Sequence, residues 1–187
     1  RGNSSLPPLE SGDWLFRFRQ TDGPSAAVDL WTTYYSMKAA FTTGVSNRKT
    51  VLSPATADNV ISVGAYTTKR VWTDMNGTVR GYYYAVMDDI ANFSSAGPRR
   101  DLRMLPHVTA PGYGVAGALS ADSLSQVSST NILQDRVHKI GYGTSAAAAH
   151  VAGAAALLLQ QNPLLTPDQA ISILQSRARS DQYTGVV

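Results

Sequence analysis

One serine of this sequence stands where a nucleophile could be held, in the segment Gly143-Thr144-Ser145, which leads into a long run of small and apolar residues. This run predicts a buried helix that begins close to Ser145. The first turn of a helix carries backbone N–H groups without intrahelical acceptors and the positive end of the helix dipole. Both would stabilise the oxyanion that forms when a serine attacks a carbonyl carbon. The alternative is that the hydroxyl residue serves only as the N-cap of the helix.

A serine hydroxyl attacks only when a general base, itself oriented by a carboxylate, takes its proton. The sequence contains three histidines. His150 lies five residues after Ser145, so on a helix it is rotated from the serine by about 140° and displaced by about 7.5 Å. His107 and His138 are better explained as structural residues. None of the three histidines is therefore predicted to be the base.

The segments around Ser145 predict an α/β fold. The β-branched run at 60–65 predicts a strand buried on both faces. A second short strand, ended by a proline and a glycine, is predicted at 107–112. Asn162-Pro163 is expected to end the long helix, and Thr166-Pro167-Asp168-Gln169 is typical of the capping box that begins another.

A hairpin is predicted over residues 71–82, with its turn at Asn76-Gly77. Three consecutive tyrosines, Tyr82, Tyr83 and Tyr84, close this segment. They have two interpretations: they pack the hairpin, which is the more common role for such residues, or they line a substrate groove.

Residues 1–49 differ in pattern from the rest of the chain. Apolar and charged residues alternate over 11–20, which predicts a half-buried strand, and residues 26–31 predict a second one after a turn. Two strands cannot bury their own apolar face. We therefore expect this segment to be a β-hairpin of a sandwich whose other strands lie elsewhere.

Composition excludes several classes of function. The 187 residues fit one domain, or one domain and part of a second, and the 43% hydrophobic content is sufficient for a core. With 16 basic and 13 acidic residues the net charge is only +3, so no nucleic-acid partner is expected. The densest basic cluster, Arg99, Arg100 and Arg103, is interpreted as a solvated loop. The chain has no cysteine, and therefore no disulfide or thiolate metal site.

No cofactor and no metal site are predicted, because no group of residues has the spacing of zinc ligands and no acidic loop indicates calcium. The apolar run 146–159 is shorter than the roughly 20 residues that a membrane span requires, so no membrane partner is expected either. The chain opens on Arg1, which is interpreted as an internal cut in a longer protein.

The serine segment resembles a known nucleophile motif. Gly143-Thr144-Ser145, followed by small residues and by His150-Val151-Ala152-Gly153, is similar to the motif of the subtilisin-like serine peptidases, or subtilases. The blocks Phe93-Ser94-Ser95-Ala96-Gly97-Pro98 and Ala110-Pro111-Gly112 resemble two further subtilase segments in the same order. The family also follows its nucleophile helix with a Thr-Pro-led helix. The resemblance covers about residues 50–180.

This resemblance implies a subtilisin-like doubly wound, mostly parallel sheet, with a small β appendage here. It also implies a serine endopeptidase in which Ser145 forms an acyl-enzyme with a polypeptide substrate, and Gly143 and Thr144 lie beside the oxyanion. His150 matches a family histidine that is not the base, and Ala149 replaces a family proline.

The family's aspartate lies in an Asp-Ser/Thr-Gly turn and its catalytic histidine in a His-Gly-Thr motif, and neither string occurs here. Its oxyanion asparagine lies in an Ala-Gly-Asn setting, to which only Gly2-Asn3-Ser4 comes near. The resemblance therefore implies that residues 50–187 are the C-terminal half of a subtilase catalytic domain. The N-terminal half would supply the base, the acid and the asparagine, and this chain alone would be inactive.

The resemblance further implies that residues 1–49 close a jelly-roll-like insertion, as in some bacterial subtilases, and that the protein is extracellular or in the cell envelope. Two rival functions remain open at this point. One is a catalytically dead subtilase fold that acts as a scaffold or binding protein. The other is a carbohydrate- or protein-binding module based on residues 1–49.

Overall fold

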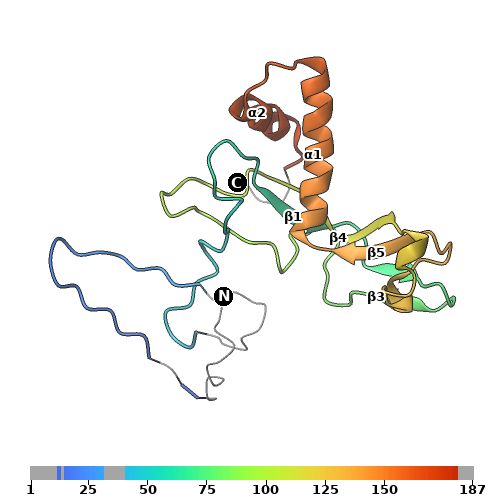
Figure 1. Ribbon diagram of the computed structural model, residues 1–187, viewed down its shortest axis with the longest axis horizontal. Coiled ribbons are helices and arrows are strands. Elements are labelled where there is room, and N and C mark those ends of the chain that lie inside the picture. Colours follow the sequence, from blue (N-terminus) through green and yellow to red (C-terminus); the bar gives the residue numbers. More distant parts are fainter. Residues whose placement is uncertain (1–11, 14, 32–40, 181–187) are drawn as a thin grey trace. The chain divides into compact units, whose positions relative to one another are not determined.

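A computed structural model describes residues 12–13, 15–31 and 41–180 (Figure 1), and the chain divides into two compact units, Arg1–Ala40 and Phe41–Val187. In the first unit, the described residues form bends and irregular chain without a strand. Phe16 is 66% exposed and Phe18 is 58% exposed. The strands predicted over 11–20 and 26–31 are therefore wrong for the described residues, because nothing there buries the alternate apolar side chains. That residues 1–49 close an inserted jelly roll stays a prediction.

The second unit is built on a three-stranded sheet in the order β1-β4-β5, formed by β1 (Val63–Thr67), β4 (Val108–Ala118) and β5 (His138–Tyr142) (Figure 1). β1 pairs with β4 in parallel, and β4 pairs with β5 antiparallel. The α/β prediction is confirmed. Within the described residues the sheet is mixed, because β5 enters from the opposite direction before the chain turns into a helix.

β4 is longer than its sequence predicts. The strand continues through Pro111 and Gly112, where the sequence predicted its end. Its register against both neighbours shifts at this point, between Tyr66 and Thr67 on β1 and between Tyr113 and Val115 on β4 itself. The strand therefore changes partner and direction of pairing instead of stopping, and its second half is available to β5.

The predicted hairpin is confirmed as β2 (Val71–Thr73) and β3 (Val79–Gly81), which pair antiparallel and are called hairpin β2–β3 below. Gly77 in its turn has a φ of 79°, which favours glycine. The side chain of Asp74 is fully buried and accepts hydrogen bonds from the backbone N–H groups of Asn76 and Thr78, both at 2.9 Å. Arg80 Nε donates to the same carboxylate at 2.8 Å.

Two α-helices follow the sheet, α1 (Thr144–Gln161) and α2 (Pro167–Arg177). Two single turns of 3₁₀ helix, Ala121–Ser123 and Ser129–Asn131, precede them in the connection from β4 to β5. α1 ends at Asn162 as predicted. α2 begins with the predicted capping box, in which the Thr166 side chain and the Gln169 side chain each accept from the other residue's backbone N–H.

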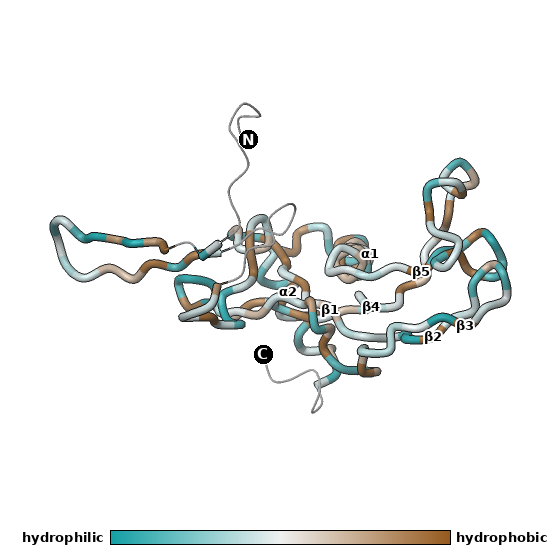
Figure 2. The backbone as a smooth tube through the Cα atoms, turned by 90° about the horizontal axis from the view of Figure 1, so that it is seen from below, coloured by the Kyte–Doolittle hydropathy of each residue, from teal (hydrophilic) through white to brown (hydrophobic). Residues whose placement is uncertain are grey.

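The core lies where α1 covers β1 and β4, as Figure 2 shows from the side of the sheet. Ala147 and Val151 of the helix pack with buried residues of the strands and of the loop before β4, namely Ala65, Ala91, Val108 and Ala110. The rest of α1 is largely open: Leu157 is 64% exposed and Leu159 is 43% exposed. The prediction of a buried helix is therefore wrong for most of its length, because one side alone meets the sheet.

The described helices lack an apolar stretch of the length that a membrane span requires.

The basic cluster predicted to be a solvated loop is held by acidic partners. Arg99 and Arg103 each place Nη1 2.9 Å from Oδ1 of Asp58. Arg99 also pairs with Asp101, and its own side chain is only 19% exposed. The hydrogen bond from Arg99 holds the pKa of both carboxyl groups below the usual range. These ion pairs join the loop at 53–59 to the loop at 99–103.

Candidate active site

Ser145 lies in the first turn of α1, immediately after the chain leaves β5. The backbone N–H of Gly143 donates to the carbonyl oxygen of Gly112 at 2.7 Å, which fixes the start of the helix to the middle of β4. Gly112 lies between Pro111 and Tyr113, the last two residues of β4 that pair in parallel with β1. In α/β proteins, ligands bind in the crevice outside the carboxyl ends of parallel strands. The segment around Ser145 is therefore placed at the edge where such a crevice forms.

The N-cap of α1 is Gly143, and it makes no side-chain capping bond. Its φ of 140° and ψ of 152° lie in a region that side chains rarely adopt, which explains why a glycine precedes the two hydroxyl residues. Thr144 and Ser145 occupy the first two helical positions. The alternative that one of them is the N-cap is therefore wrong.

The side chain of Ser145 is available for chemistry. The residue is exposed, and within the part of the chain that the structure describes its hydroxyl makes no hydrogen bond. Its own backbone N–H lies in the first helical turn, where no intrahelical acceptor exists. Nucleophile and oxyanion donor can thus come from one residue, as the sequence predicts for this position.

The close contact between β1, β4 and the start of α1 requires glycine at position 112. A Cβ atom there would lie 2.4 Å from Cβ of Ala65 and 3.1 Å from the carbonyl oxygen of Gly143. Any side chain would therefore push β4 away from β1 or move the turn that precedes Ser145.

His107 is placed far from Ser145 and is engaged in the structure. Its Nδ1 accepts a hydrogen bond from the backbone N–H of Ser62 at 2.9 Å. Burial lowers the pKa of His107, so the neutral ring that can accept this bond is favoured. The residue precedes β4, and five extended residues separate it from Gly112 by about 16 Å. Its structural role is the one expected from the sequence.

His138 and His150 are also directed elsewhere. His138 pairs with Asp135, with 2.7 Å between Nδ1 and Oδ2, and this hydrogen bond lowers the pKa of Asp135. His138 begins β5, so about 13 Å of extended chain separate it from Tyr142 at the end that leads to Ser145. His150 places Nδ1 2.8 Å from the carbonyl oxygen of Ala146 on its own helix. No histidine of the described residues therefore reaches the Ser145 hydroxyl.

An aromatic cluster lies beside the start of α1, and it comprises Trp72, Tyr82, Phe93, Tyr113 and Tyr142. The ring of Tyr82 is at its centre: the ring centroids are 4.8 Å from Trp72, 4.5 Å from Tyr113 and 5.6 Å from Tyr142. Burial, together with the neighbouring tyrosines, raises the pKa of Tyr82 to about 12. Tyr142 is 64% exposed and is separated from Ser145 by two residues.

The three consecutive tyrosines, Tyr82, Tyr83 and Tyr84, thus differ in their surroundings. Tyr82 packs the hairpin through Trp72, as the more common interpretation predicted, and at the same time reaches Tyr142. Tyr83 and Tyr84 are 79% and 94% exposed. Neither Tyr113 nor Tyr142 was predicted from the sequence to belong to the site. The signal that could have identified them is their position, directly after Ala110-Pro111-Gly112 and directly before Gly143.

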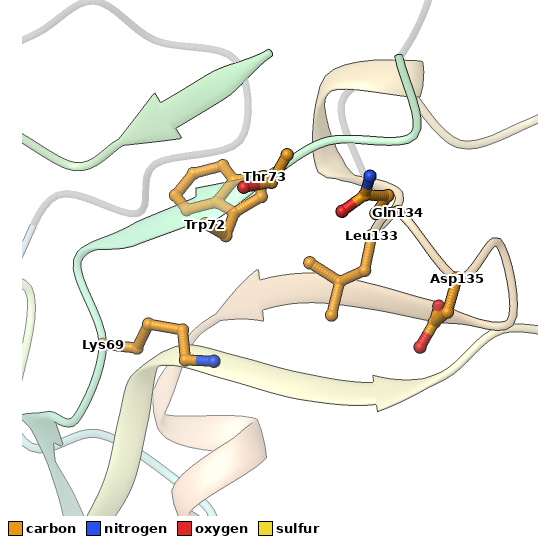
Figure 3. Close-up of a pocket in the computed structure, with 6 residues that line it drawn as sticks. All are labelled: Lys69, Trp72, Thr73, Leu133, Gln134 and Asp135. Atoms are coloured by element: carbon orange, nitrogen blue, oxygen red, sulfur yellow. The ribbon is translucent and has the colours of Figure 1, made fainter. Parts of the chain in front are cut away.

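An open hollow of about 520 Å³ lies between hairpin β2–β3 and the loop before β5 (Figure 3). Trp72 and Leu133 face this space, and Lys69 and Asp135 lie on opposite sides of it. Trp72 lines the hollow and also belongs to the aromatic cluster. The hollow shares no residue with the segment from Gly143 to Ser145.

The described residues supply a candidate nucleophile and little else of a serine peptidase site. They contain no histidine in reach of Ser145, and Gly2-Asn3-Ser4, the weak match to an oxyanion motif, lies outside them. Among the same residues no three histidine, aspartate or glutamate side chains are grouped so as to hold a metal ion.

Comparison with known proteins finds relatives that belong to one family. Residues 21–186 match the model of the subtilase family. The serine protease AprX of Bacillus subtilis is 30% identical over 88% of this chain, and pyrolysin of Pyrococcus furiosus is 32% identical over 88%. A solved structure of a cold adapted subtilisin-like serine proteinase is 30% identical, covers 71% of this chain and superposes with a TM-score of 0.43.

The chain spans only part of these relatives: 35% of AprX, 12% of pyrolysin and 34% of the solved chain. The resemblance of the serine segment is confirmed by the family match, which includes every block identified in the sequence. This chain belongs to the subtilase family of serine peptidases.

Proposed function

We propose that this chain is the C-terminal part of a serine endopeptidase in which Ser145 is the nucleophile. The observation that carries the proposal is the exposed, unbonded hydroxyl in the first turn of α1, preceded by a glycine with positive φ. Ser145 Oγ attacks the carbonyl carbon of a peptide bond and an ester forms. The amine leaves with the proton that the base took from the serine. Water then attacks the ester, which releases the acid and restores the hydroxyl.

Gly143 and Thr144 lie beside the developing oxyanion in this proposal, and the backbone N–H of Ser145 is one donor to it. The base, the acid that orients the base and a second oxyanion donor come from a preceding part of the same protease. Two findings support this division: the described residues hold no base near Ser145, and this chain spans only 35% of AprX and 12% of pyrolysin. The partner of this chain is therefore its own N-terminal half, and its substrate is a polypeptide.

The test is the turnover number of the full-length protein with a peptide substrate. Replacing Ser145 by alanine should lower kcat by about 10⁶. Ser125→Ala is the matched control, because it makes the same substitution at an exposed serine outside α1 and should leave kcat unchanged. A folded full-length protein without peptidase activity would instead favour the rival function, a catalytically dead subtilase fold used as a scaffold.

We also propose an extracellular or cell-envelope location for the full-length protein, which family membership supports. Fractionation of cells that produce it tests this. Recovery of the mature protein from the cytoplasm alone would contradict the proposal.

A further inference from the structure

The ring of Tyr82 connects hairpin β2–β3 to the end of β5 that precedes the nucleophile segment. Tyr82, which follows β3, packs against Trp72 of β2 with 51° between the ring planes and contacts the ring of Tyr142 edge-on, at 82° between the ring planes. Tyr142 is followed by Gly143, whose hydrogen bond to Gly112 fixes the start of α1. The hairpin therefore positions a ring at the end of β5 that leads directly to Ser145.

The surroundings of Tyr142 indicate what it can bind. Its ring is supported by Tyr82, Tyr113 and Phe93, with centroid distances of 5.5 to 5.6 Å, yet 64% of the residue remains exposed. A supported ring of this kind presents a rigid apolar surface at little cost in conformational entropy. An apolar side chain that covers it gains from the water that both surfaces release.

Distance limits which part of a substrate can reach this ring. Tyr142 is separated from the nucleophile by two residues, and an extended polypeptide advances about 3.3 Å per residue. The substrate residues that can cover Tyr142 are therefore those close to the scissile bond. The hollow of Figure 3 is not lined by Tyr142 and is flanked by charged side chains, so it does not provide this surface.

We infer that hairpin β2–β3 is a specificity element of this peptidase, and that Tyr142, supported by Tyr82, forms a subsite for a large apolar or aromatic side chain next to the scissile bond. This inference rests on the proposed function. Tyr142 contacts the substrate, and Tyr82 acts as a positioning residue through Tyr142. Neither takes part in bond making or breaking.

The experiment uses the full-length protein and peptides that carry either phenylalanine or alanine at each of three positions on both sides of the scissile bond. The measured quantity is the ratio of kcat/KM for the phenylalanine peptide to that for the alanine peptide. Tyr142→Ala should lower this ratio about tenfold at one position only. Tyr82→Ala should lower it at the same position, and the double variant should lose little more than Tyr142→Ala alone, because the two rings act as a unit.

Three variants serve as controls. Tyr82→Phe keeps the supporting ring and should keep the ratio. Tyr84→Ala removes a tyrosine of the same segment that is 94% exposed and has no ring contact, and Lys69→Gln changes the charge beside the hollow. Neither should alter the ratio at any position. If Tyr82→Ala does not fold, Tyr82→Leu and the exposed Tyr142→Ala decide the question.

The outcomes separate this inference from the proposed function. An equal loss for all peptides, or an unchanged ratio, would overturn the inference while cleavage that depends on Ser145 still supports the peptidase. A shift of the ratio in Tyr84→Ala equal to that in Tyr142→Ala would also overturn it. If the folded full-length protein cleaves no peptide and Ser145→Ala changes nothing, the proposed function fails and the subsite fails with it.

Discussion

At the scale of single residues, the orientation of Ser145 depends on the glycine two positions before it. Gly143 has a φ of 140°, and a Cβ atom there would have no close neighbour, the nearest atom being the backbone nitrogen of Ser145 at 3.8 Å. Gly143→Ala should therefore destabilise the protein through backbone strain alone, by roughly 1–3 kcal/mol. Urea unfolding measures this. Gly141→Ala is the matched control, because its Cβ would also lie in open space but without positive φ. Equal losses in the two variants would contradict the role given to Gly143.

His107 gives the fold a pH dependence whose sign follows from its burial. Because burial disfavours the charged ring, the pKa of His107 is lower in the folded protein than its ordinary value of 6.5. The unfolded chain then binds a proton that the folded protein does not, so the free energy of unfolding should fall as pH drops below about 6.5. His107→Asn offers an acceptor to Ser62 without this titration. Its urea midpoint should change less between pH 7.5 and 5.5 than that of the unaltered protein. Parallel changes would show that His107 is not the cause.

At the scale of elements, the junction of β1, β4 and α1 is the most restrictive feature. Gly112→Ala brings a methyl group to within 2.4 Å of the Ala65 side chain. It should cost about 3 kcal/mol, near the upper end of what overpacking a core costs. Gly117→Ala, in the same strand but with no atom within 4 Å of the added methyl, should be nearly neutral. Thermal unfolding of the two variants distinguishes them, and a neutral Gly112→Ala would show that the sheet can open there without loss.

The turn of hairpin β2–β3 depends on the carboxylate of Asp74. Its hydrogen bond from Arg80, together with those from two backbone N–H groups, lowers the pKa of Asp74. The carboxylate therefore stabilises the folded protein at pH values above the ordinary pKa of an aspartate. This stabilisation is lost as pH falls through the lowered pKa. Asp74→Ala leaves both N–H groups without an acceptor. Hydrogen exchange of Asn76 and Thr78 should become roughly tenfold faster or more. The exposed Asp122→Ala should not change these rates. Protection that persists in Asp74→Ala would show that the hairpin does not need the carboxylate.

Elements with local signals could be predicted from the sequence. The Asn76-Gly77 turn and the capping box at Thr166 are fixed by residues within a few positions of each other, and both are found. Other predictions depend on partners that are distant in the sequence. They are the strands over 11–20 and 26–31, the end of β4 at Gly112 and the burial of α1. Those partners decide whether a strand forms and whether a helix face is buried, so predictions from periodicity alone were wrong. The same reason explains which site residues could be predicted. Ser145 lies in a local sequence motif, whereas the neighbours of Tyr142 come from distant parts of the chain and are brought together only by the fold.

At the scale of the whole molecule, the described residues of the second unit cover α1 on one side only, with Leu157 and Leu159 exposed. An apolar helix that presents such side chains to water is expected to meet further structure. The proposed N-terminal half would supply it together with the base. This account predicts that the 187-residue chain alone has no peptidase activity, while the full-length protein cleaves peptides. Adding the N-terminal half in trans and restoring activity would strengthen it, and activity of the isolated chain would contradict it.

The most direct measurement is to treat the folded full-length protein with a fluorophosphonate and to map the modified residue by peptide mass spectrometry. These reagents phosphonylate a serine whose hydroxyl is activated by a base. The account predicts one adduct, on Ser145, that is absent from Ser145→Ala and from the isolated chain. A folded full-length protein that takes up no reagent at Ser145, or that is modified at another serine, would contradict it.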